Sequence, residues 1–159
     1  MNNNIATSGE EFLGYQAGRL QDLINEMIDC CHDRNLYETR RFGLPYAEIR
    51  SLMLFDGERY LTVKNIAQKL DVAKSRVTKL VDSLIGKGLL ERINDPKDAR
   101  IRLISLSPEG QRKLAEVDIF HQEIHRKIIL QLDPDDRKNM LTFLEKLRSA
   151  MEAVKETFL

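Results

Sequence analysis

The N-terminal part of the chain carries apolar residues at the spacing of an α-helix. They are Leu20, Leu23, Ile24, Met27, Ile28 and Cys31, and residues three and four positions apart share one face of a helix. Ser8 and Glu11 have the Ser-x-x-Glu spacing of a capping box, which marks a helix N-terminus. The pattern predicts a first helix of about 22 residues that starts near Ser8. A polar linker is expected after it, at residues 33–43.

Three shorter helices are predicted within residues 45–88. Pro45 suits the first turn of a helix, and Thr62 is a favourable N-cap for the next one. Their apolar stripes are Ile49, Leu52 and Met53, then Ile66, Ala67 and Leu70, then Val77, Leu80, Val81, Leu84 and Ile85. A tight turn at 71–73 separates the last two helices, and Gly88 is placed to end the third. Two helices joined so closely form a helix-turn-helix.

The apolar residues change their period after these helices. Residues 90–93 and 101–106 are rich in Ile and Leu and flank a polar loop at 94–100. Two short apolar runs around a polar loop predict a β-hairpin. Because successive side chains of a strand alternate between its faces, Arg100 and Arg102 are expected on the same, exposed face.

Two long helices are predicted at the C-terminal end. Ser107 and Pro108 give the first of them a cap and a proline at its first position, and Asp133 and Pro134 repeat this for the second. The apolar residues of the second alternate in steps of four and three and are Met140, Leu144, Leu147, Met151, Val154 and Phe158. This spacing is typical of helices that pack along their length.

The terminal helices carry more apolar surface than a short helix-turn-helix can cover. Soluble monomers tolerate only small exposed apolar patches, so a second copy of the chain is expected to cover this surface. The predicted dimer interface is Leu20, Ile24, Met27, Leu144, Leu147, Met151, Val154 and Phe158. The predicted fold class is mainly α with a small β-hairpin wing, a winged helix-turn-helix of about six helices.

Composition limits the function classes. The chain has 159 residues, 42% hydrophobic and 31% charged, which fits one folded unit over residues 1–159. It has no long apolar run and no signal-peptide pattern, so we expect a cytoplasmic protein without a membrane partner. Cys30 and Cys31 are adjacent and do not form an ordinary disulfide with each other, which agrees with a reducing compartment. No nucleophile with its base, glycine-rich phosphate loop or dense ligand cluster points to an enzyme or to a bound cofactor.

The net charge of zero hides a segregation of charge along the chain. Residues 62–113 hold 12 Lys and Arg against 6 Asp and Glu, whereas the remaining residues hold 13 against 19. A basic segment on an otherwise acidic protein is typical of a surface that binds a polyanion.

Four motifs in this basic segment resemble those of the MarR (multiple-antibiotic-resistance regulator) family. They are LDVAKSRVTKLVDSL at 70–84, GLLER at 88–92, DPKDAR at 95–100 and LSPEG at 106–110. Members of this family are dimeric, ligand-responsive transcription regulators of bacteria and archaea, and most are repressors. The resemblance implies a DNA-binding lobe at 45–106 and dimerisation helices at 8–33 and 108–159.

The helix that starts near Lys74 suits the major groove of DNA, which admits one α-helix. The predicted DNA contacts are Lys74, Ser75, Arg76, Thr78, Lys79, Lys97, Asp98, Arg100 and Arg102. Arg76 is the best candidate for a bidentate contact to guanine. The resemblance assigns Arg100 to the minor groove, with Asp98 holding its guanidinium. The family usually has Ser or Thr at Ala73, so Asp71 is expected to cap this helix instead.

The partner implied is double-stranded DNA with an inverted repeat, bound by a homodimer. The alternative non-enzymatic role is a winged helix used for protein association only. The resemblance also implies a small aromatic or phenolic effector, bound where the dimer helices meet the DNA-binding lobe. The residues predicted to form that pocket are Cys31, Tyr37, Arg41, Arg50 and Met53, since an arginine beside apolar side chains suits an aromatic carboxylate.

Two other switches stay open for the same fold. A thiol switch would use Cys30 or Cys31, but Cys31 lies on the apolar stripe, which favours inert packing. A zinc switch would use His121 and His125, which lie one helical turn apart. Two ligands at this spacing do not complete a tetrahedral site, and a packed histidine is the preferred interpretation, so no metal is expected.

Overall fold

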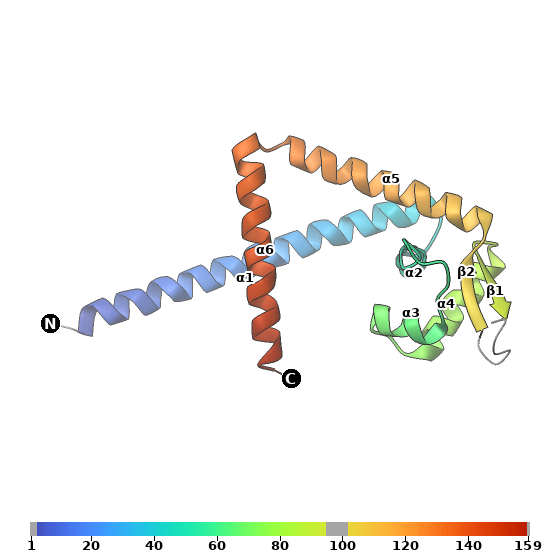
Figure 1. The fold of residues 1–159 in the computed structure, drawn as a ribbon. Coiled ribbons are helices and arrows are strands. Elements are labelled where there is room, and N and C mark those ends of the chain that lie inside the picture. Colours follow the sequence, from blue (N-terminus) through green and yellow to red (C-terminus); the bar gives the residue numbers. More distant parts are fainter. Residues whose placement is uncertain (1–2, 95–101, 159) are drawn as a thin grey trace. The chain divides into compact units, whose positions relative to one another are not determined.

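The computed structural model describes residues 3–94 and 102–158, with side chains for 9–94 and 102–158. The elements in chain order are α1 (Asn3–Phe42), α2 (Tyr46–Met53), α3 (Val63–Leu70), α4 (Lys74–Gly86), β1 (Leu90–Asn94), β2 (Arg102–Leu106), α5 (Pro108–Leu130) and α6 (Pro134–Glu156) (Figure 1). The chain forms two compact units, Met1–Gln111 and Arg112–Leu159. The predicted class, mainly helical with a small hairpin, is confirmed over the described residues.

Helix α1 is much longer than predicted. It contains 40 residues, so Ser8 lies inside it and does not start it, and the expected polar linker is helical. The linker has no Gly or Pro before Gly43, and Arg34 and Glu38, one turn apart, form an ion pair at 3.2 Å. Gly43 has a φ of 65°, a left-handed conformation that suits the residue just after a helix.

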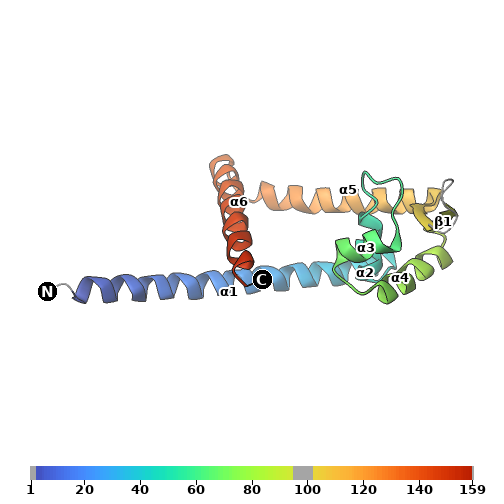
Figure 2. The same ribbon diagram turned by 60° about the horizontal axis from the view of Figure 1, so that its bottom comes forward.

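The helix-turn-helix forms as the sequence predicts. In both views α2, α3 and α4 lie together, and the hairpin follows α4 (Figure 1 and Figure 2). The Thr62 side chain accepts a hydrogen bond from the Asn65 amide at 3.1 Å, and the Asn65 side chain accepts one from the Thr62 amide at 3.1 Å. This reciprocal capping box confirms Thr62 as the N-cap of α3.

Replacing this cap gives a first testable prediction. Thr62→Ala removes the acceptor for the Asn65 amide and is expected to lower the free energy of unfolding by about 1 kcal/mol. Urea denaturation followed by circular dichroism measures it. Thr142→Ala, on the exposed face of α6, is the matched control and should be neutral or slightly stabilising, because Ala has the higher helix propensity. Equal effects of the two substitutions would contradict a capping role.

The turn between α3 and α4 corrects one expectation. Ala73 is the N-cap residue of α4, and no side chain accepts a hydrogen bond there. The expectation that the Asp71 side chain caps this helix is therefore wrong. Asp71 ends α3 instead, with a left-handed φ of 54° and its amide directed to the Ala67 and Gln68 carbonyls. An Asp tolerates this conformation better than most residues do. The start of α4 is therefore left without a side-chain cap.

The core of the first unit lies between these helices and the hairpin. Its fully buried apolar residues are Ile49, Leu52, Ile66, Val77, Val81, Leu84 and Ile104. They come from α2, α3, α4 and β2, and the predicted apolar stripes account for most of them. Burial of one face of each short helix explains why segments of only eight residues are stable, since such helices are marginal in isolation.

The wing has a contact that the sequence did not predict. Strands β1 and β2 pair antiparallel from Leu90 opposite Leu106 to Asn94 opposite Arg102. Leu61 forms an additional bridge to Ile104, with N–O distances of 2.9 and 2.8 Å. The residue before the cap of α3 therefore ties that helix to the wing.

Helices α5 and α6 start at the predicted caps. The Ser107 hydroxyl donates to the Gly88 carbonyl at 2.6 Å and accepts from the Gly110 amide at 2.9 Å. The Asp133 carboxylate accepts from the Asp136 amide at 2.9 Å. Among the described residues, no helix is long and apolar enough to span a membrane.

Candidate nucleic-acid interface

Helix α4 has one buried face and one exposed polar face. Val77, Val81 and Leu84 are fully buried and fix the helix in the first unit. The residues of α4 predicted to contact DNA are all exposed, namely Lys74, Ser75, Arg76, Thr78 and Lys79. The structure thus brings these five predicted residues together on one helix with three cationic side chains. Their contacts with DNA stay a prediction.

The uncapped start of α4 adds to this surface. The first amides of a helix have no partner within the helix, and they carry a partial positive charge. At α4 no side chain satisfies them, and Lys74 and Ser75 occupy the first two positions. A phosphate oxygen is a suitable acceptor for such amides.

The wing is described only in part. Lys97, Asp98 and Arg100 lie outside the described residues. Arg102 is exposed at the start of β2, as predicted. Arg92 of β1 forms an ion pair with Asp82 of α4, which joins the wing to the exposed side of the predicted recognition helix. Both side chains are partly exposed, so the pair contributes little stability, roughly 0 to 1 kcal/mol.

A buried acid that the sequence analysis missed connects α2 to α4. Glu48 is 4% exposed, and its carboxylate accepts hydrogen bonds from the Ser83 hydroxyl at 2.7 Å and the Lys87 ammonium at 2.5 Å. Hydrogen bonds to a charged group are stronger than neutral ones and more directional than apolar contacts. Glu48 therefore fixes the orientation of α4. The sequence contained a sign that Glu48 is buried, because this residue lies one turn before Leu52 on the apolar stripe of α2.

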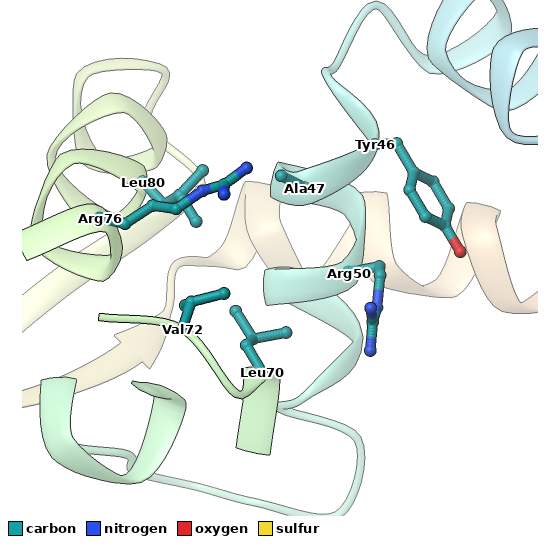
Figure 3. Close-up of a pocket in the computed structure, with 7 residues that line it drawn as sticks. All are labelled: Tyr46, Ala47, Arg50, Leu70, Val72, Arg76 and Leu80. Carbon is teal, nitrogen blue, oxygen red and sulfur yellow. The ribbon is translucent and has the colours of Figure 1, made fainter. Parts of the chain in front are cut away.

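The predicted effector residues are divided between α1 and α2, and their role stays a prediction. Arg50 lines a pocket of about 220 Å³ in the first unit, together with Tyr46, Ala47, Leu70, Val72, Arg76 and Leu80 (Figure 3). Cys31, Tyr37, Arg41 and Met53 are not among its lining residues. Cys31 and Arg41 are ten residues apart on the same helix, about 15 Å along its axis. The unexpected length of α1 therefore separates Cys31 from Arg41 within one chain.

The two alternative switches depend on side chains of α1 and α5. Cys30 and Cys31 are both exposed in the single chain, so the expected packing of Cys31 does not occur within it. The rings of His121 and His125 lie 6.4 Å apart between centroids. Among the described residues, no group of three His, Cys, Asp or Glu is arranged to hold a metal ion.

The predicted dimer residues are largely uncovered in the single chain. Exposed members are Leu20, Met27, Leu144, Met151, Val154 and Phe158, and Ile24 and Leu147 are half-buried. No residue of α6 is buried. An apolar row of this length without a partner is unusual for a soluble helix.

Known sequences share the central part of the chain. The model of the MarR family matches residues 42–101. The transcriptional regulator AdcR of Streptococcus pneumoniae is 32% identical over 113 residues, which are 69% of this chain and 76% of AdcR. The transcriptional repressor MdtR of Bacillus subtilis is 32% identical over 110 residues, 69% of this chain and 71% of MdtR.

Solved structures agree with the fold. A mutant of S. aureus MepR has a TM-score of 0.76 at 20% identity, covering 82% of this chain and 97% of MepR. Streptococcus pneumoniae FabT, in complex with DNA, has a TM-score of 0.73 at 19% identity, covering 85% of this chain and 99% of FabT. With the sequence relatives and the winged helix-turn-helix geometry, these matches lead to one conclusion: the chain belongs to the MarR family of transcriptional regulators.

Proposed function

We propose that this protein is a homodimer that binds an inverted repeat in double-stranded DNA, represses nearby genes and is released by a small aromatic or phenolic effector. The observation that carries the proposal is the exposed basic face of α4, on a helix held by a fully buried apolar face and by Glu48. A rigid helix of this kind fits the major groove.

Each predicted contact has a chemical role in this complex. Arg76 reads guanine through its guanidinium, and Lys74 and Ser75 bind phosphate at the start of α4. Thr78 and Lys79 lie along the same edge. In the wing, Arg100 enters the minor groove, where the negative potential is strongest. Asp98 holds Arg100, and Lys97 and Arg102 contact phosphates.

Two related folds support this arrangement. The FabT structure is a complex with DNA, and S. aureus MepR, at 22% identity and a TM-score of 0.65, is also known as a DNA complex. In a twofold dimer the two copies of α4 would meet half-sites about one helical turn apart. The uncovered apolar rows of α1 and α6 are the proposed dimer interface.

Selection of bound sequences from random double-stranded DNA tests the proposal. We expect enrichment of an inverted repeat, with affinity that falls steeply as salt increases, because bound phosphates release counterions. The selection is repeated with benzoate and with zinc to test the switch. Enrichment of no common sequence would overturn the proposal and favour a role in protein association.

Two substitutions on α4 separate base recognition from phosphate binding. Arg76→Ala should lower affinity for the selected site by about 1–3 kcal/mol and relax the preference at one base pair in each half-site. Lys74→Ala should weaken binding to all DNA sequences to a similar extent. It should also reduce the magnitude of the slope of log affinity against log salt concentration, by about one for each phosphate that the protein no longer neutralises. Fluorescence anisotropy with labelled duplexes measures both effects.

Lys138→Ala, an exposed lysine of α6, is the control for these substitutions and should change neither quantity. If Arg76→Ala retains full affinity and preference while the dimer is intact, the assignment of Arg76 to guanine is wrong.

A further inference from the structure

One buried acid of α2 holds the junction between α4 and the wing. The Glu48 carboxylate accepts a hydrogen bond from the Ser83 hydroxyl on one oxygen, at 2.7 Å, and from the Lys87 ammonium on the other, at 2.5 Å. Ser83 lies in the last turn of α4, and Lys87 directly follows this helix and leads into β1 at Leu90. Glu48 therefore fixes the C-terminal end of the predicted recognition helix at two points.

The two members of the Glu48–Lys87 ion pair are not equally buried. The Glu48 side chain is 5% exposed, and the Lys87 side chain is 39% exposed. A buried carboxylate that loses its cation is strongly destabilising, whereas an ammonium on a long, partly exposed side chain can turn toward water. Replacement of a whole buried ion pair by apolar side chains of similar volume is often neutral for stability. Two apolar side chains would therefore hold α2 against α4 about as strongly as this pair does.

The charged pair adds direction to the contact between α2 and α4. A hydrogen bond constrains the positions of its donor and acceptor, whereas apolar attraction is non-directional and lets one helix shift against another. Lys87 belongs to the basic segment at 62–113, but its ammonium is bound to Glu48, so a DNA phosphate would have to compete for it. The geometry gives Lys87 a task inside the protein.

We propose that Glu48 and Lys87 are positioning residues for DNA recognition: the pair adds little net stability, and by fixing the orientation of α4 it sets how sharply the protein distinguishes one DNA sequence from another. The proposal rests on the proposed function, in which α4 reads base edges. A base contact requires hydrogen-bond geometry, whereas attraction to phosphates is independent of sequence. Loss of the pair should therefore reduce discrimination between sequences and leave affinity for unrelated DNA nearly unchanged.

Thermal melting at equal protein concentration tests the stability of the pair without DNA. Lys87→Met leaves the buried carboxylate with Ser83 as its one donor among the described residues, and it should lower the melting temperature by at least about 6 °C. Glu48→Leu should lower it less, because Lys87 reaches water and the Ser83 hydroxyl can donate to the carbonyl four residues earlier. The double variant Glu48→Leu with Lys87→Met should melt within about 3 °C of the wild type. A double variant that melts as low as Lys87→Met would overturn the proposal.

Fluorescence anisotropy tests discrimination in the same double variant, whose net charge equals that of the wild type. The affinity for the selected site is divided by the affinity for a duplex with one base pair changed in each half-site. This ratio should fall at least about fivefold, because a single base pair accounts for about 1–3 kcal/mol, roughly 5- to 150-fold. Affinity for unrelated DNA should stay within about threefold of the wild-type value. Glu48→Gln, which keeps an acceptor oxygen at the same position, should lose less of the ratio than Glu48→Leu.

A second ion pair of the same residue types provides the matched control. Lys69 of α3 pairs with Glu58 at 2.9 Å, and both side chains are exposed, 42% and 45%. This pair does not involve α4. The double variant Glu58→Leu with Lys69→Met should therefore keep the wild-type ratio within about twofold.

Failure of this inference is distinguishable from failure of the proposed function. If the variant without the Glu48–Lys87 pair keeps wild-type discrimination, or if the control loses as much, the inference is overturned and DNA recognition stands. If the wild-type protein selects no DNA sequence, the proposed function fails and the role in discrimination fails with it, whereas the melting temperatures still decide whether the pair stabilises the fold.

Discussion

The double substitution Leu144→Glu and Met151→Glu is expected to convert the proposed dimer to monomers. Both side chains lie on the apolar row of α6 and are about half exposed in the single chain, 46% and 53%. Full burial of one such apolar side chain stabilises a dimer by about 1.5–3 kcal/mol. Because both protomers lose both side chains, the dimer dissociation constant should rise more than about a thousandfold. The buried carboxylates add a desolvation cost. Sedimentation velocity at micromolar concentration measures the change.

DNA affinity should fall together with dimerisation, because one protomer contacts one half-site only. Ser149→Glu adds a charge to an exposed position of the same helix and is the control, with no expected change in mass or affinity. If the doubly substituted protein remains a dimer, then α6 is not at the interface, and another surface must cover its apolar row.

Gly110→Ala is expected to be among the most destabilising single-methyl additions in the described chain. A Cβ at this position would lie 1.9 Å from the Leu89 carbonyl oxygen and 2.9 Å from its carbon. These are backbone atoms, and that oxygen also accepts a hydrogen bond from the Ser107 amide at 3.1 Å, so the start of α5 must shift. We expect a loss of about 3 kcal/mol, equivalent to a decrease of roughly 6–12 °C in melting temperature.

Gly14→Ala is the matched control, because an added Cβ in α1 meets nothing within 4 Å. It should stabilise the helix by about 0.5–1 kcal/mol, through the lower conformational entropy of Ala in the unfolded chain. The two proteins are compared at equal concentration, since the melting of a dimer depends on concentration. A Gly110→Ala protein that melts like the wild type would show that α5 does not start against Leu89.

Much of the fold could be predicted because its determinants are local. The apolar stripes of α2, α3 and α4 repeat within one or two turns, and the caps at Thr62, Ser107 and Asp133 each act on an amide three residues away. The exposed position of the α4 contact residues followed from the same periodicity. The sequence was less informative about α1, where Ser8 resembles a helix start but helix formation continues through it.

The missed features connect residues that are far apart in sequence. Glu48 bonds to Ser83 and Lys87, which are 35 and 39 residues away, and Leu61 pairs with Ile104. The pocket joins Arg50 to Arg76, whereas the sequence placed Arg50 with residues of α1. No periodic pattern encodes such pairs, because each depends on how helices pack against one another.

The sequence alone determined the type of each element, most of its boundaries, the apolar faces and the family, because short-range hydrogen bonds and burial periodicity act within a few residues. Only the tertiary structure decided how α4 is held by Glu48, that the start of α4 is uncapped, and that Arg76 borders a pocket as well as the predicted DNA surface. These properties depend on the distances between packed elements, and the order of residues along the chain does not specify those distances.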